Sequence, residues 1–100
     1  MTIRIRRLRG ERRTIVLISG AVDAGAVPSL RRALAKALRA GAPILVDLTW
    51  ATSIHRTGVA ALVNAHQRAE RAGTSLLLRT EPTQIRTVLA AFDIPPDKPH

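Results

Sequence analysis

The chain has 100 residues, of which 46% are hydrophobic and 23% charged, a composition typical of one globular domain with a single core. Its longest apolar runs, such as residues 76–78, are too short to cross a bilayer, and the basic N-terminus is not followed by the apolar block of a secretory signal. The absence of cysteine excludes a disulfide framework, a thiolate nucleophile and a thiol metal site. We therefore expect a soluble, cytoplasmic domain without membrane insertion.

The charge is strongly unbalanced, with 16 lysine and arginine residues against seven acidic residues and a net charge of +9. Six arginines lie within the first thirteen residues: Arg4, Arg6, Arg7, Arg9, Arg12 and Arg13. Basic excess attracts phosphate, but nucleic-acid readers usually add aromatic side chains, and this chain has one Trp and one Phe. We favour a solvated basic strand face, with an acidic protein partner as the second interpretation and nucleic acid as the third.

The first two strands are expected to form a hairpin. Residues 2–8 alternate isoleucine with arginine, the period-two pattern of an edge strand with one wet face. Residues 14–19 are nearly continuously apolar and β-branched, as in a strand buried on both faces. Gly20 is expected to end this second strand.

From residue 27 the apolar spacing changes to three and four, which predicts an amphipathic helix. Pro28 suits its first turn and Gly41 its end. Residues 44–48 then form a buried strand. A helix between these strands is the kind of crossover that joins parallel strands.

A second helix is predicted over residues 58–72, with Gly73 closing it. Its inward side chains are expected to be Val59, Leu62, Val63, His66 and Ala69. Residues 75–79 form a fourth strand, and Pro82 opens a third helix. The buried face of that helix consists of Ile85, Val88, Leu89 and Phe92. Three prolines follow from residue 95, so residues 1–94 are expected to form the single domain and residues 95–100 a frayed tail.

The order ββαβαβα predicts a small α/β sandwich, in which a mixed, mostly parallel four-stranded sheet with one antiparallel edge strand is covered by about three helices. Sites in such sheets gather where strand ends meet helix starts. Residues 47–58 are expected to form a short polar loop at such a place, with Thr57 on the first helical turn beside Gly58. Two interpretations of Thr57 stand: it caps the helix, or its hydroxyl is a switch at the unpaired helix amides.

Four segments carry a further signal by their order and spacing. They are Ile-Ser-Gly-Ala-Val-Asp at residues 18–23, Val-Asp-Leu at residues 46–48, His-Arg-Thr-Gly-Val at residues 55–59 and Ala-Gly at residues 72–73. This order resembles the STAS domain, the fold shared by bacterial anti-sigma-factor antagonists and the cytoplasmic tails of sulfate transporters. The resemblance covers nearly the whole chain.

In that family, the second serine of an Asp-Ser-Ser-Gly motif is phosphorylated by a partner anti-sigma factor that is itself a serine/threonine kinase. The unphosphorylated antagonist sequesters this kinase. The resemblance places Thr57 at the phosphorylated serine and Asp23 at an acidic residue of the partner-binding face. It implies that Asp23, His55, Arg56, Thr57 and Gly58 contact the partner, together with the exposed side of the second helix.

Two residues depart from the family motif. His55 and Arg56 stand where the family usually has aspartate and the first serine. A histidine is mostly neutral at pH 7 and either ring nitrogen can donate, whereas Arg56 places a permanent guanidinium beside Thr57. That guanidinium can pair with a phosphate on Thr57 or with an acidic partner.

Other candidate residues have local interpretations. Asp23 suits a turn, and Asp47 is expected to bind backbone amides. Trp50 is either packed or an interface anchor. His55 and His66 lie eleven positions apart without ligand spacing, so we expect structural histidines and no metal site.

Catalytic and cofactor motifs, such as a phosphate-binding loop or a nucleophile elbow, are missing, so we expect no enzyme and no cofactor. The sequence thus predicts a regulatory protein-binding module that resembles an anti-sigma-factor antagonist bound by an anti-sigma kinase. The alternatives are a STAS subunit of a lipid-transport ABC ATPase complex without phosphorylation, and a basic nucleic-acid-binding protein. The oligomeric state is left open.

Overall fold

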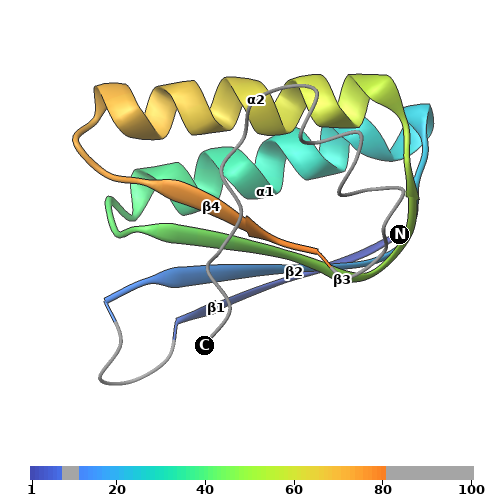
Figure 1. Cartoon of the computed structure of the whole chain (residues 1–100), viewed down its shortest axis with the longest axis horizontal. Coiled ribbons are helices and arrows are strands. Elements are labelled where there is room, and N and C mark those ends of the chain that lie inside the picture. Colours follow the sequence, from blue (N-terminus) through green and yellow to red (C-terminus); the bar gives the residue numbers. More distant parts are fainter. Residues whose placement is uncertain (8–11, 81–100) are drawn as a thin grey trace.

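Within residues 1–7 and 12–80, which the computed structural model describes, a four-stranded sheet forms one layer and two α-helices form the other (Figure 1). The elements are β1 (Thr2–Arg7), β2 (Thr14–Val22), the short 3-10 helix η1 (Ala24–Ala26), α1 (Val27–Arg39), β3 (Ile44–Ile54), α2 (Arg56–Arg71) and β4 (Leu76–Arg79). The predicted third helix from Pro82 and the predicted tail at residues 95–100 lie outside the described residues.

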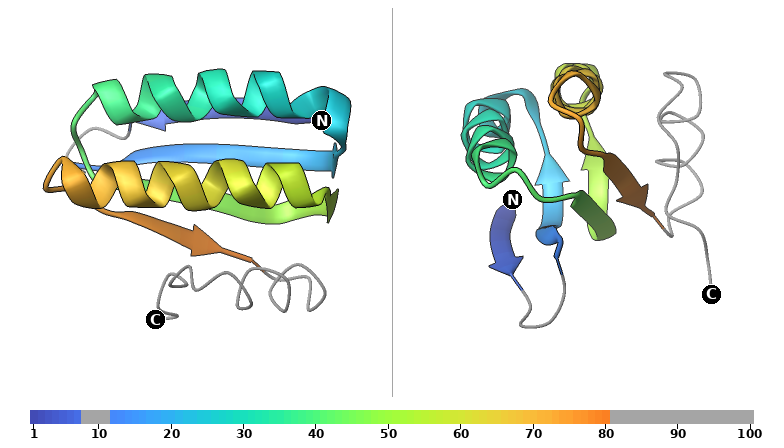
Figure 2. Two further views of the ribbon diagram at one scale, coloured as in Figure 1. Left: turned by 90° about the horizontal axis from the view of Figure 1, so that it is seen from above. Right: turned by 90° about the vertical axis from the view of Figure 1, so that its left-hand side faces the viewer.

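The strands of this sheet lie in the order β1-β2-β3-β4, with β1 antiparallel to β2 and the other neighbours parallel. The predicted mixed, mostly parallel sheet with an antiparallel edge strand is therefore confirmed. Both helices cover the same face, α1 above β1 and β2 and α2 above β3 and β4 (Figure 2). The opposite face carries no helix within the described residues (Figure 2).

The core lies between the helices and the sheet. Alternate residues of β2 and β3 point at the helices and are buried, as the period of a strand requires. The core includes Val16 and Ile18 of β2, Val46 and Leu48 of β3, Leu30 and Leu34 of α1, and Val59 and Leu62 of α2. No helix in the described part of the chain is long and apolar enough to span a membrane.

The third strand is longer than the sequence predicted. Residues 49–54, expected in a polar loop, continue β3 as far as Ile54. The reason lies in the pairing with β2, whose irregularities between Leu17 and Ser19 and between Gly20 and Ala21 absorb a change of register. Gly20 adopts a φ of +81°, a conformation that glycine tolerates, so β2 passes through it and pairs Val22 with Ile54.

The two helices differ from the prediction chiefly at their ends. In α1, Pro28 lies in the first turn. The predicted apolar stripe is buried at Val27, Leu30 and Leu34, and its fourth residue, Leu38, is partly buried against the core. In α2, the first helical residue is Arg56, two positions before the predicted start at Gly58. The earlier start places the whole His55 to Gly58 segment on or beside the first turn of α2.

Candidate functional site

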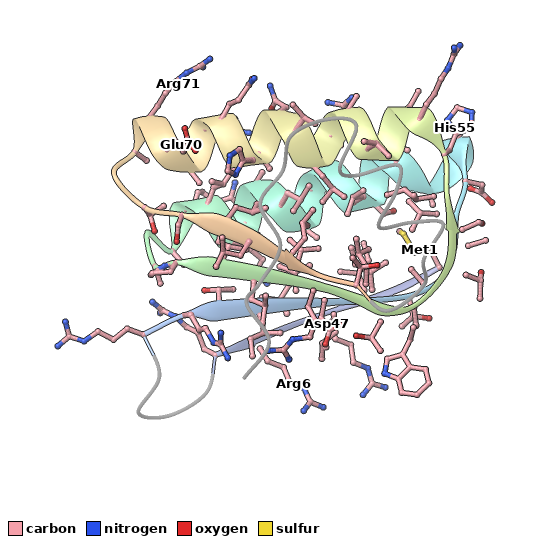
Figure 3. The ribbon with its side chains drawn as sticks, in the orientation of Figure 1. Met1, Arg6, Asp47, His55, Glu70 and Arg71 are labelled. Atoms are coloured by element: carbon pink, nitrogen blue, oxygen red, sulfur yellow. The ribbon has the colours of Figure 1, made fainter. Side chains whose placement is uncertain are left out.

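The parallel strands β2 and β3 end side by side, and the segments that follow them meet at one corner of the molecule. Asp23 follows the last residue of β2, and His55 follows the last residue of β3. The His55 backbone N–H donates to the Val22 carbonyl at 2.7 Å, which joins the two strand ends. We call the surface formed by Asp23, His55, Arg56, Thr57 and Gly58 the corner; its His55 is labelled in Figure 3.

The side chain of His55 caps α2. His55 has extended backbone angles (φ −70°, ψ 149°), and its ring Nδ1 accepts the Thr57 backbone N–H at 3.2 Å. The same nitrogen lies 2.8 Å from the Thr57 hydroxyl oxygen. An accepting Nδ1 must be unprotonated, so the neutral ring carries its proton on Nε2 and the hydroxyl donates to Nδ1. The cap is therefore a histidine, and the interpretation of Thr57 as the helix cap is wrong.

Thr57 presents its hydroxyl on the outside of the molecule. Arg56 and Thr57 are both exposed on the first turn of α2, and that turn contains no acidic residue. The start of a helix carries partial positive charge from its unpaired amides, and the Arg56 guanidinium adds a full charge beside it. The corner can therefore accommodate added negative charge at Thr57 without a like-charged neighbour on this turn.

Asp23 has a local structural function at the same corner. Its Oδ1 accepts the Ala26 backbone N–H at 2.9 Å and so caps η1, as the turn interpretation of this residue predicted. The residue is nevertheless exposed. The corner thus combines a carboxylate on one strand end with a hydroxyl, an imidazole and a guanidinium on the next.

Gly58 allows the first turn of α2 to approach the strand ends closely. A Cβ atom at this buried position would lie 3.1 Å from Cγ1 of Val22 and 3.1 Å from Cγ1 of Ile54. Both neighbours are β-branched and have little rotamer freedom to move aside. The glycine therefore sets the distance between the corner's helix and the two strands.

The Gly58→Ala variant is expected to lower the free energy of unfolding by about 1 kcal/mol. The crowded Cβ costs roughly 1–3 kcal/mol, while alanine regains about 1 kcal/mol of helix propensity. Urea denaturation followed by circular dichroism measures the change, with the exposed residue Asn64 as the control because Asn64→Ala on the same helix should have little effect. A Gly58→Ala protein more stable than wild type would contradict the close approach.

A family model described as "Mlab, STAS domain" matches residues 6–95. The chain belongs to the STAS domain family. The resemblance predicted from the sequence is thereby confirmed, although no curated protein matches the chain.

Several solved structures share the fold of this chain over most of its length. SpoIIAA, an anti-sigma factor antagonist in its unphosphorylated form, has a TM-score of 0.78 at 16% identity, covering 99% of this chain and 90% of that chain. An anti-sigma factor antagonist from Mycobacterium paratuberculosis has a TM-score of 0.75 at 17% identity, with coverage of 96% and 86%. The phosphorylated form of the Bacillus cell fate determinant SpoIIAA has a TM-score of 0.74 at 16% identity, with coverage of 92% and 84%. At these identities the likeness establishes the fold.

In this STAS domain the predicted site residues lie together. The corner gathers all five of them from the ends of β2 and β3 and the start of α2. Trp50, a further candidate residue, lies on β3. It has 73% of its surface exposed and is therefore not packed in the core. Asp47 accepts the Thr49 backbone N–H at 2.9 Å, which confirms the expected bond to a backbone amide.

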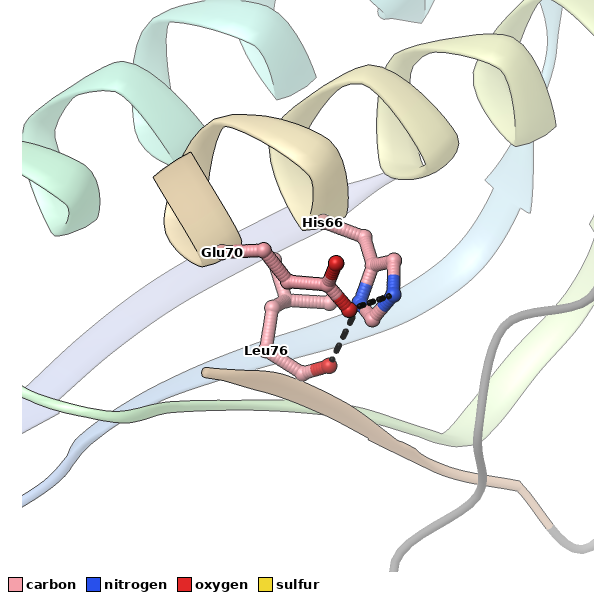
Figure 4. A network of polar contacts seen from close by, with 3 residues as sticks. All are labelled: His66, Glu70 and Leu76. Atoms are coloured by element: carbon pink, nitrogen blue, oxygen red, sulfur yellow. Dashed lines mark hydrogen bonds and ion pairs between the residues drawn. The ribbon is translucent and has the colours of Figure 1, made fainter. Parts of the chain in front are cut away.

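His66 lies away from the corner and joins α2 to the sheet of the STAS domain (Figure 4). Its Nδ1 lies 3.1 Å from the Leu76 carbonyl oxygen of β4, and its Nε2 lies 2.9 Å from Oε1 of Glu70, one turn further along α2. Both ring nitrogens therefore lie within hydrogen-bonding distance of an oxygen atom, one on the sheet and one on the helix. Within residues 1–7 and 12–80, no group of three or more potential metal ligands exists. The expected structural interpretation of His66 agrees with these contacts.

Proposed function

We propose that this chain is a non-enzymatic regulatory module that acts as an anti-sigma-factor antagonist by binding an anti-sigma factor kinase at the corner. The observation that carries the proposal is the exposed Thr57 hydroxyl on the first turn of α2, beside Asp23 on the neighbouring strand end. The fold is shared with antagonist structures described as unphosphorylated and phosphorylated. The sequence resemblance also aligns Thr57 with the phosphorylated serine of the family motif.

Phosphorylation of Thr57 would change the corner in two ways. A phosphate adds roughly −1.5 to −2 charges at the helix start, where the helix dipole and the Arg56 guanidinium stabilise it. Esterification also removes the hydroxyl proton that is donated to His55 Nδ1, while the Thr57 backbone N–H keeps its bond to that nitrogen. The helix cap therefore persists in both states, but the surface that the partner meets becomes charged and larger.

Capture of the partner from the source organism tests this proposal. Three affinity-tagged proteins would be compared: wild type, Thr57→Glu, and a control with the same charge change at exposed Ser75, which lies at the opposite end of α2. We expect the wild-type and Ser75→Glu proteins to retain the anti-sigma kinase, which would be recognised as an ATPase of the histidine-kinase fold. We expect the Thr57→Glu protein to lose it. Mass spectrometry of the wild-type protein should find phosphate on Thr57. Retention of no such kinase, with Thr57 unmodified under all growth conditions, would refute the proposal.

The second candidate function is a STAS subunit that binds a lipid-transport ATPase without phosphorylation. Two observations favour it: the matching family model is described as "Mlab, STAS domain", and His55 and Arg56 replace the Asp and Ser usual in the phosphorylated motif. In that case the corner and the exposed side of α2 dock onto a transporter ATPase. The capture experiment separates the two candidates, because it identifies the fold of the retained ATPase.

A further inference from the structure

The outer edge of β1 is one of the two edges of the sheet, and it lies far from Thr57 in the sequence. Among the described strands, β1 pairs only with β2, so its outer edge has no strand beside it. An edge strand presents a row of unpaired backbone N–H and C=O groups, which another extended chain can bind. Charged side chains on such an edge discourage pairing with a copy of the same protein.

A groove runs along this edge beneath α1. It has a volume of about 750 Å³. Ile3 and Ile5 of β1 line its strand side together with Met1, and Ser29, Ala33 and Lys36 of α1 line its helix side. Its remaining lining residues are Gly25, Ala26 and Asp23, so the groove reaches the corner at Asp23, the one carboxylate in its lining. Ile3 and Ile5 are half-buried and pack against the core, so they form a short apolar strip beside the unpaired strand edge, in a groove whose exposed lining is otherwise more polar than apolar.

The other face of the same strand is basic. Arg4 and Arg6 alternate with the isoleucines and are exposed, and Arg6 points away from the helices in Figure 3. Their cross-strand neighbours on β2 are Leu17 and Ile15, so neither arginine lies opposite a carboxylate. Within residues 1–7 and 12–80, no ion pair joins either arginine to an acidic side chain.

These observations point to one occupant, and we propose that β1 binds an extended acidic segment of a partner protein as an additional strand. In a strand beside β1, every second side chain would lie in the groove next to Ile3 and Ile5, and the intervening side chains would lie beside Arg4 and Arg6. The fitting sequence therefore alternates apolar with acidic residues. A second copy of this chain does not fit, because it would place arginines beside arginines on the same face. This inference does not depend on the proposed function of Thr57.

A synthetic peptide of about seven residues that alternates valine and glutamate tests the proposal by fluorescence anisotropy with the full-length protein. Two control peptides have the same composition: one is scrambled so that alternation is lost, and one carries backbone N-methyl groups that remove its ladder donors. We expect the alternating peptide to bind, and both controls to bind at least about tenfold more weakly. Amide NMR shifts should change in β1 and α1 but not at residues 55–58.

Charge-reversal variants locate the binding surface. The double variant Arg4→Glu and Arg6→Glu is expected to weaken binding at least about tenfold at 0.15 M salt, roughly the physiological ionic strength. The matched control, Arg31→Glu and Arg68→Glu, makes the same charge change on the groove between α1 and α2 and should leave the affinity within about twofold. Circular dichroism confirms that both proteins fold. Equal binding of the N-methylated peptide, equal losses in both double variants, or a single-stranded oligonucleotide that outcompetes the peptide would overturn the proposal.

Discussion

The Thr57→Glu variant is expected to bind the partner kinase about 30-fold more weakly than wild type, which corresponds to about 2 kcal/mol. The physical reason is that in the proposed complex the partner buries the neutral hydroxyl of Thr57, and a carboxylate at that position resists desolvation and adds bulk. The substitution should not unfold the protein, since an acidic residue in the first turn of a helix stabilises it by about 0.3–1 kcal/mol. Isothermal titration calorimetry with the captured kinase measures the affinity.

The Thr57→Val variant is the matched control for this experiment. Valine keeps the branched shape of threonine but removes the hydroxyl that lies 2.8 Å from His55 Nδ1. The helix cap through the Thr57 backbone N–H remains, so we expect binding within about fivefold of wild type and no phosphorylation. Equal affinities of wild type and Thr57→Glu would show that the kinase does not contact the corner.

The Leu62→Ala variant should lose about 3 kcal/mol of stability, the largest effect on folding that we expect from a single substitution in α2. Leu62 is completely buried between α2 and the sheet, so its truncation removes apolar contact and leaves a cavity in the core. Urea denaturation measures the loss. Because α2 carries the corner, this variant also shows how far partner binding depends on the packing of the helix.

Two substitutions on the same helix calibrate the result for Leu62. Leu62→Met keeps most of the volume and should cost less than about 1.5 kcal/mol. Asn64→Ala changes an exposed side chain and should alter the free energy of unfolding by less than about 0.5 kcal/mol. A loss at Leu62→Ala no larger than that at Asn64→Ala would contradict the placement of α2 on the sheet.

The fold could be predicted from the sequence because its strongest signals are periodic. The alternation of Ile3 and Ile5 with arginines identified the edge strand. The apolar stripe of Val27, Leu30, Leu34 and Leu38 identified α1. The length of β3 could not be predicted in this way. Its extension to Ile54 depends on irregular pairing with β2, a tertiary feature that leaves no periodic pattern in the sequence.

The site was predicted in part. The rule that strand ends meet helix starts pointed to the segment that contains Thr57, the resemblance to the STAS domain added Asp23, and the structure brings both residues to one corner. The cap by His55 was missed because propensity favours Ser, Thr, Asp and Asn at this position, although a histidine ring also has an acceptor nitrogen. The groove beside β1 was missed because it arises from the placement of α1 over an edge strand.

Hydrogen exchange of the protein alone and in complex with its captured ATPase most directly tests the claim that the corner is the docking surface. We predict that binding slows exchange at residues 23–27 and over the first two turns of α2, and that phosphorylation of Thr57 abolishes this protection. Protection confined to the face of the sheet opposite α1 and α2, with exchange at residues 55–63 unchanged, would contradict it.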